Sequence, residues 1–438
     1  MRFPILAVLA CSAALSVPST SAQYGVFNLF AGTPTMAPAE SRAMSRAYSG
    51  VALRDAGPSG FLLNPAHAAY AEPGVALTTS LASPYFGKSP YLSGDGIVGS
   101  NQILNAGAAR GAWRIGAGFS RSRYGFGRQE ALTLTDAGGN EIGQIPAGEE
   151  YQSSYVLSLG IARTGRFSGA LGVSARRSAY GTPQFLDEYA GWNADLGMTA
   201  SYQVVPSTPD GFDLTVGIGY ARLGMGGEAR GVVRFSDLPA RTPLATPVRA
   251  GWSLTVGREG AFKGQSLRLF DLSVALEASA VVTEFEATEE GPLERSANPL
   301  LGPIRPLDVL LGRGRAPAGL FSTQDEPEEA YRAPVTGYRS LRLRALEAVE
   351  ASVGMHTDAF EGPDGFTTWA FGGGVSASGL VQSGLFGRPS PALSRLVERG
   401  DLALHFAYYD AWEDREGDTG FDYNDPWMLG ATLSVAWP

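Results

Sequence analysis

Apolar and polar residues alternate strictly along several segments of the chain. From Trp192 to Tyr202 every even-numbered residue is apolar, and every odd-numbered residue is small or polar. The same period of two returns in residues 212–220, 248–256 and 427–437. Because successive side chains of a β-strand point to opposite faces, the pattern predicts strands with one apolar and one polar face.

Aromatic residues bracket these apolar rows. The pairs are Trp192 with Tyr202, Phe212 with Tyr220, and Trp427 with Trp437. A strand of about ten residues rises roughly 3.3 Å per residue, and at a tilt of about 40° it spans about 25 Å along a membrane normal. This is the height of the apolar band of an outer-membrane barrel, whose two edges carry aromatic girdles. A soluble β-sandwich is the alternative, but its strands commonly have only about five or six residues.

Thirteen segments carry strand patterns. They are residues 75–82, 102–109, 112–122, 151–163, 167–178, 191–204, 211–223, 247–258, 267–280, 345–357, 367–379, 400–411 and 426–437. Single-chain bacterial barrels have an even number of strands, with short turns on the periplasmic side and long loops outside. The odd number therefore indicates that one strand is missing from this set.

Connection lengths locate the missing strand. Short turns alternate with long connections, which are residues 123–150, 179–190 and 224–246. Counting back from a periplasmic C-terminus puts the short turns on the wrong side unless one more strand lies between residues 281 and 344. We therefore predict an all-β fold, a transmembrane antiparallel barrel of fourteen strands, with the extra strand near residues 336–343. Residues 228–236 are a competing candidate for the extra strand, but a strand there would still leave the short turns on the wrong side of the membrane.

The N-terminus has the layout of a cleaved secretory signal. Residues 1–22 contain an arginine, an apolar stretch and small residues before the expected cut. A lipoprotein cleavage site at Cys11 is the alternative, although the apolar stretch continues past it. Cys11 is the only cysteine, so a chain cut after residue 22 has no disulfide. We expect a signal peptide over 1–22, an N-terminal plug segment over 23–74 and the barrel over 75–438.

Glycine is frequent on the polar faces of the predicted strands. The chain has 57 glycines, and examples on these faces are Gly116, Gly118, Gly217, Gly219, Gly372 and Gly374. Glycine weakens a strand interior, so its repeated use predicts a curved wall or a crowded lumen. After the N-terminus no run of eighteen apolar residues occurs, which excludes helical membrane spans.

The net charge is −9 and comes largely from predicted loops. An acidic surface argues against nucleic acid as a partner. Trp437 is the penultimate residue of a strand that ends the sequence, and a terminal aromatic strand is what barrel assembly factors recognise. Pro438 departs from the usual terminal aromatic residue. We therefore expect the barrel assembly machinery among the partners.

The segment before the first strand carries a recognisable pattern. It contains Ser41, Arg42, Met44, Ala47, Ala52 and Asp55, followed by Asn64-Pro65-Ala66. On its own, Asn-Pro-Ala is typical of a turn into a strand. Together, these residues resemble the opening of the long-chain fatty-acid transporter superfamily of outer-membrane proteins (FadL-like), including its PorV/PorQ-like branch. The sequence departs from that pattern at Ser45-Arg46, where a glycine pair is expected.

The resemblance implies a fourteen-stranded barrel in the cell outer membrane of a Gram-negative-type bacterium, with the N-terminal segment folded inside as a plug, or hatch. It implies passive uptake of a small hydrophobic compound of fatty-acid or aromatic type. In the PorV-like branch it instead implies an accessory role in secretion or surface attachment of exported proteins. The implied partners are outer-membrane lipid and lipopolysaccharide, a hydrophobic solute and, in the second case, exported proteins.

Seven ionisable residues fall on the inward faces of predicted strands. They are Asp195, Asp213, Asp271, Glu277, Glu350, His356 and His405. An acid–base cluster is one interpretation, but no Gly-x-Ser-x-Gly or similar nucleophile motif accompanies it. Polar contacts between plug and wall are the simpler interpretation, and we expect no enzyme activity.

The sequence offers little that suits a metal ion or a cofactor. Oxygen-bearing residues at 418–425 could suit calcium, but the spacing is not that of an EF-hand and a solvated loop explains it. The sequence contains no P-loop, dinucleotide fingerprint or Cys/His metal spacing. We therefore expect no cofactor and no metal.

Overall fold

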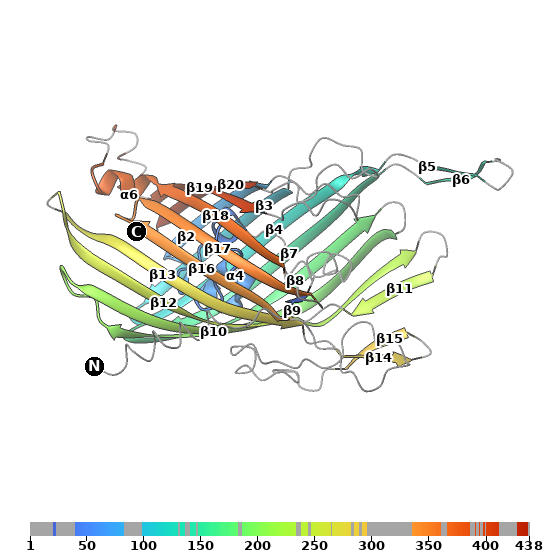
Figure 1. Ribbon diagram of the computed structural model, residues 1–438, viewed down its shortest axis with the longest axis horizontal. Coiled ribbons are helices and arrows are strands. Elements are labelled where there is room, and N and C mark those ends of the chain that lie inside the picture. The colour runs from blue at the N-terminus through green and yellow to red at the C-terminus, as the bar shows by residue number, and fades with distance from the viewer. Residues whose placement is uncertain are drawn as a thin grey trace.

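Fourteen antiparallel strands form a closed ring (Figure 1). The structure is a computed structural model, and it describes residues 21–22, 40–82, 99–129, 132–135, 141–145, 148–182, 186–233, 238–243, 247–263, 265–281, 284–288, 291–295, 335–360, 366–385, 390, 394, 397–398, 400–410 and 427–436. Each wall strand pairs with its neighbour along the chain, and β20 closes the ring on β2. The sequence-based prediction of a fourteen-stranded antiparallel barrel is confirmed.

The wall strands differ widely in length. They are β2 (Gly74–Ala82), β3 (Gly99–Arg110), β4 (Trp113–Gln129), β7 (Gly148–Arg163), β8 (Phe167–Thr182), β9 (Leu186–Val205), β10 (Phe212–Val233), β12 (Pro247–Phe262), β13 (Gln265–Val281), β16 (Val335–Ala345), β17 (Val349–Phe360), β18 (Phe366–Ser376), β19 (Gly400–Asp410) and β20 (Trp427–Ala436). The longest, β9 and β10, have 20 and 22 residues, so they extend well past the ends of their shorter neighbours.

Short strands lie outside this ring. β1 (Ser21–Ala22) pairs with β17, and β11 (Leu238–Pro243) pairs with the end of β10. Two hairpins are formed by β5 (Leu132–Thr135) with β6 (Glu141–Ile145), and by β14 (Glu284–Thr288) with β15 (Gly291–Arg295). The described helices are α3 (Ser41–Met44), α4 (Gly60–Leu63), the 3₁₀ helix η1 (Pro65–Tyr70) and α6 (Ala377–Gln382). None of them is long and apolar enough to cross a membrane.

The extra strand predicted near residues 336–343 is β16, so that prediction is confirmed. Residues 228–233 extend β10 and pair with β11, and they add no strand to the wall. Several details of the sequence-based account are wrong. The predicted long connections 123–150, 179–190 and 224–246 are mostly strand, because wall strands continue into them and short strands β5, β6 and β11 form within them. β18 stops before residue 379, because the Ser376 side chain accepts a 3.1 Å hydrogen bond from the Gly379 amide and caps α6.

Apolar side chains cover the outward face of the wall. Leu171 and Met198, paired between β8 and β9, are 57% and 43% exposed. Phe167 and Trp192, toward opposite ends of the same two strands, are still more exposed. This is the band and the pair of aromatic edges that lipid contact requires. Tyr220, expected at one edge of the band, is buried instead, and Trp437 lies outside the described residues.

The two ends of the ring differ in their connections. At one end, called here the short-turn end, successive strands are joined by brief links such as Gly111-Ala112 and residues 346–348. The connection from β18 to β19 is the exception there, because it contains α6. The other end, called the long-loop end, carries the hairpin β5–β6 and the connection from β13 to β16. Bacterial barrels place short turns in the periplasm.

Residues 40–73, called here the luminal segment, lie inside the ring (Figure 1). A row of glycines makes room for them. Gly107, Gly116, Gly160, Gly172 and Gly197 are paired one to the next across β3, β4, β7, β8 and β9. A Cβ atom at Gly116, Gly172 or Gly197 would overlap, respectively, the carbonyl oxygen of Ala68, the carbonyl oxygen of Pro65 or the side chain of Asn64. The luminal segment therefore rests directly on the wall backbone, and the predicted crowded lumen is confirmed.

Candidate functional site between the luminal segment and the wall

Asn64 ties the luminal segment both to itself and to the wall. Its side-chain oxygen accepts a 3.1 Å hydrogen bond from the Ala66 amide and caps η1. Its side-chain nitrogen donates to the carbonyl oxygens of Val51, at 2.9 Å, and of Met198 in β9, at 3.1 Å. Pro65 occupies the first turn of η1, where its missing amide proton is no loss. The Asn64-Pro65-Ala66 motif is thus a buried joint between three stretches of chain.

Glu277, on β13, anchors the middle of the luminal segment. Its carboxylate accepts hydrogen bonds from the amides of Gly50 and Val51, the latter at 2.6 Å. Arg249, on β12, donates to the other carboxylate oxygen at 3.1 Å and to the Tyr48 carbonyl oxygen at 2.7 Å. A buried carboxylate needs such partners, because an uncompensated charge in the lumen is costly.

Arg42 is bound by two wall residues that the sequence analysis placed in the lumen. Its guanidinium lies 3.5 Å from a Glu350 carboxylate oxygen. One of its terminal nitrogens lies 2.6 Å from Nε2 of His405. Because a guanidinium can only donate, His405 accepts through Nε2 and is therefore neutral, with its proton on Nδ1. Arg42 fixes the start of the luminal segment to β17 and β19.

Asp55 forms the fourth attachment. Arg342, on β16, donates to the Asp55 side chain at 2.9 Å and to its carbonyl oxygen at 2.8 Å, and Arg344 lies 3.5 Å from the same carboxylate. The Arg342 guanidinium holds the pKa of Asp55 well below its usual range. The Asp55 side chain is 48% exposed, so this attachment borders water at the short-turn side of the segment.

The remaining predicted lumen residues lie apart from these attachments. Asp195 binds Arg176 on the neighbouring strand through hydrogen bonds of 2.9 and 3.1 Å, and it also accepts one from the Gly224 amide. Asp213 and Asp271 both bind Arg268 at the short-turn end. The side chain of His356 lies outside the described residues, as does the candidate calcium loop 418–425. The six residues whose side chains are described therefore belong to several contacts rather than to one acid–base cluster.

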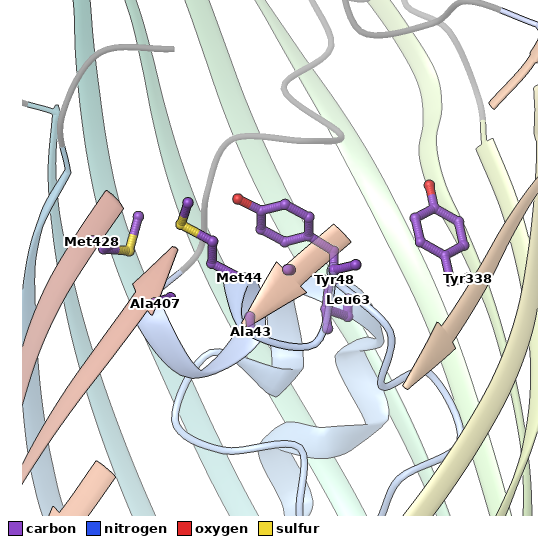
Figure 2. Packing of buried hydrophobic residues seen from close by; sticks show 9 residues of the cluster. Ala43, Met44, Tyr48, Leu63, Tyr338, Ala407 and Met428 are labelled. Atoms are coloured by element: carbon purple, nitrogen blue, oxygen red, sulfur yellow. The ribbon is translucent and has the colours of Figure 1, made fainter. Parts of the chain in front are cut away.

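On its other side, the luminal segment presents apolar residues toward the long-loop end (Figure 2). We call this group the apolar cluster; it consists of Ala43, Met44, Ala47, Tyr48, Leu63, Tyr338, Ala370, Ala407 and Met428. Met44 and Met428 are fully buried. Tyr338 and Met428 lie near the long-loop ends of β16 and β20, which fixes the side on which the cluster sits.

Some residues of the apolar cluster and of the attachments were predictable from the sequence, and others were not. The sequence analysis singled out Met44, but not Tyr338 or Met428, which occupy inward positions where the neighbouring inward residues are small or polar. It also missed the arginines Arg249 and Arg342. An apolar or cationic residue on the polar face of a strand was the signal that could have identified them.

The site joins the luminal segment to the wall through hydrogen bonds and ion pairs. Its charged groups are paired with each other or with backbone groups, and the described part of the chain has no group of three His, Cys, Asp or Glu residues suited to a metal ion. Hydrogen bonds and ion pairs of this kind can break and re-form as a segment shifts. The arrangement suits a segment that docks against the wall.

No protein-family model matches the sequence, and no curated protein matches it. The structure is similar to the Pseudomonas putida toluene transporter TodX (12% identity, TM-score 0.42, 90% of this chain and 96% of that chain). It is also similar to the Ralstonia pickettii toluene transporter TbuX (12% identity, TM-score 0.45, 91% and 98%). A third similar structure is a Pseudomonas aeruginosa FadL homologue (11% identity, TM-score 0.42, 91% and 98%).

Proposed function

We propose that this protein is an outer-membrane channel for passive uptake of small hydrophobic compounds, of fatty-acid or aromatic type, and that the luminal segment is its plug. One observation carries the proposal. Inside a closed barrel with an apolar outer face, the luminal segment offers the apolar cluster to one end and ion pairs to the other. A solute that moves into the barrel from the long-loop end would reach these buried apolar side chains before the ion pairs of Asp55.

Passage requires the luminal segment to move. The glycine row brings η1 into direct contact with the wall backbone, so no solute fits between η1 and strands β4, β7, β8 and β9. The polar contacts that resist movement include those of Asn64, Glu277, Arg42 and Asp55, together with weaker hydroxyl contacts such as that between Ser45 and Ser352. A net hydrogen bond is worth only about 0.5–1.5 kcal/mol, so a shift of the segment that keeps part of this set is energetically accessible.

Uptake into liposomes tests the proposal. Purified protein is reconstituted, and the entry of a labelled aromatic hydrocarbon and of a labelled fatty acid is followed over time. Protein-containing vesicles should take up one or both solutes faster than empty vesicles. A rate equal to that of empty vesicles for both solutes would contradict the proposal.

An accessory role in secretion or surface attachment is the second candidate, carried over from the resemblance to the PorV-like branch. Most of the long connections on which it depends, including residues 411–426, lie outside the described residues. Photo-crosslinking from residues 412–425 in cells distinguishes the two functions. Capture of one specific exported protein, together with absent solute uptake, would favour the accessory role.

A further inference from the structure

Four arginines at the short-turn end face outward from the wall. They are Arg110, Arg163, Arg166 and Arg258, and together we call them the arginine belt. Arg110 and Arg163 are paired on either side of Trp113, which is an outward residue with 55% of its surface exposed. All four arginines are exposed, and among the described residues none of them forms an ion pair.

Exposed aromatic rings accompany the arginine belt. The Arg166 guanidinium lies 5.4 Å from the ring centre of Tyr202, and the Arg258 guanidinium lies 5.0 Å from that of Phe212. Both rings belong to the outward, exposed side of the wall. Aromatic residues of a barrel gather at the level of the lipid headgroups, so the four cations lie at that level too.

Most carboxylates described at the same end contact another arginine. Asp213, Glu259 and Asp271 lie within ion-pair distance of Arg268 rather than of the arginine belt. Asp210, exposed in the turn before β10, is a further carboxylate at this end. The arc from β16 through β20 to β2 differs as well. At the short-turn end its exposed outward residues are apolar, for example Val349 and Val435. Among the described outward residues of the wall strands at this end, the arginines therefore lie on one arc, from β3 to β12, of a protein whose net charge is −9.

We propose that the arginine belt binds the headgroups of anionic phospholipids in the membrane leaflet at the short-turn end. A guanidinium donates two parallel hydrogen bonds to a phosphate, which a point-like ammonium cannot do. An aromatic ring beneath the guanidinium restricts the motion of the guanidinium. The ring leaves the N–H edge of the guanidinium accessible to a phosphate. A zwitterionic headgroup offsets its phosphate with its own ammonium group, so headgroups with net negative charge are favoured.

Site-specific fluorescence quenching tests this proposal in the reconstituted full-length barrel, with Cys11 replaced or removed. Gly165→Cys, labelled with bimane, lies between Arg163 and Arg166, and a Cβ at this position meets only ordinary contacts. Val349→Cys carries the control label on the other arc, where the outward residues that the structure describes at the short-turn end are apolar. The barrel is reconstituted into phosphatidylcholine vesicles that contain a fixed minor fraction of phosphatidylglycerol. In one preparation the phosphatidylglycerol is brominated. In the other preparation an equal amount of the phosphatidylcholine is brominated instead.

The ratio of quenching by brominated phosphatidylglycerol to quenching by brominated phosphatidylcholine should be at least about twofold higher at residue 165 than at residue 349. R163Q/R166Q should lower the ratio at residue 165 toward that at residue 349, and R163K/R166K should restore it only in part. Equal ratios at the two positions in the chain that keeps its arginines would overturn the proposal. The test does not require transport, so it stands or fails independently of the proposed channel function.

Discussion

At the scale of single residues, Asn64 is the clearest determinant of how the luminal segment docks. Asn64→Ala removes three hydrogen bonds and leaves the buried Ala66 amide without the side-chain oxygen that caps it. Each buried group left unsatisfied costs about 1–3 kcal/mol, so amide hydrogen exchange of residues 51–70 should speed up by at least about tenfold. Asn64→Asp keeps the oxygen that caps η1 and should give a smaller increase. Unchanged exchange in N64A would show that these bonds do not hold the segment.

We predict that His67 makes docking of the luminal segment sensitive to pH. Burial lowers the pKa of His67 to about 4 in the docked state, whereas a hydrated histidine has a pKa near 6.5. Protonation therefore favours the undocked segment. The docked state should lose about 1.4 kcal/mol for each pH unit between about 6.5 and 4. The pKa of Asp55 lies below this window, so its ion pair with Arg342 persists throughout it.

This pH dependence can be measured as solute uptake at about pH 7 and about pH 5. Uptake should be faster at the lower pH in the natural chain, because more of the segment is undocked. His67→Gln cannot bind the proton and should flatten the dependence. An equal pH response in the natural chain and in H67Q would exclude His67 as its source.

At the scale of elements, the glycine row that joins β3 to β9 sets the fit between η1 and the wall. Gly172→Ala places a methyl group against the Pro65 carbonyl oxygen. Overpacking of this kind costs about 1–3 kcal/mol and should displace η1, which raises both uptake and protease cleavage within residues 60–70. Gly169→Ala, on the same strand but with only an ordinary contact for its Cβ, is the matched control. Equal behaviour of G172A and G169A would contradict the close seating of η1.

Strand positions were largely predictable from sequence, because period-two alternation records which face meets lipid. β16 could be inferred from the sidedness of the turns alone. The ends of elements were less predictable. α6 depends on the cap at Ser376, and the extension of β10 depends on pairing with β11, which residue alternation does not encode.

The contacts of the luminal segment were predictable only in part. Alternation placed Glu277, Glu350 and His405 on inward faces, and they contact the luminal segment as polar partners. It could not distinguish them from Asp213 and Asp271, which bind Arg268 instead. Which group an inward residue binds depends on its position along the barrel axis and on which backbone group of the luminal segment lies opposite it. The period-two pattern contains neither kind of information.

At the scale of the whole molecule, two kinds of surface are separated along the barrel axis inside the ring. The apolar cluster faces the long-loop end, and the ion pairs of Asp55 lie toward the short-turn end. Outside the ring, an apolar band ends in aromatic residues and, on one arc, in the arginine belt. These features are those expected of a membrane-spanning barrel, and the proposed function assigns control of passage to the luminal segment inside it.

The central claim is that solute passes only when the luminal segment moves, and a reversible lock tests it most directly. The hydroxyl oxygens of Ser45, in the segment, and Ser352, on β17, lie 2.6 Å apart, which suits a disulfide in S45C/S352C. Thr255 and Ser273, joined between two wall strands at 3.1 Å, give the control pair T255C/S273C.

Oxidised S45C/S352C should lose solute uptake and regain it on reduction, while both single-cysteine variants and the oxidised control pair should transport normally. Uptake by the fully oxidised S45C/S352C barrel at the rate of its reduced form would contradict the account.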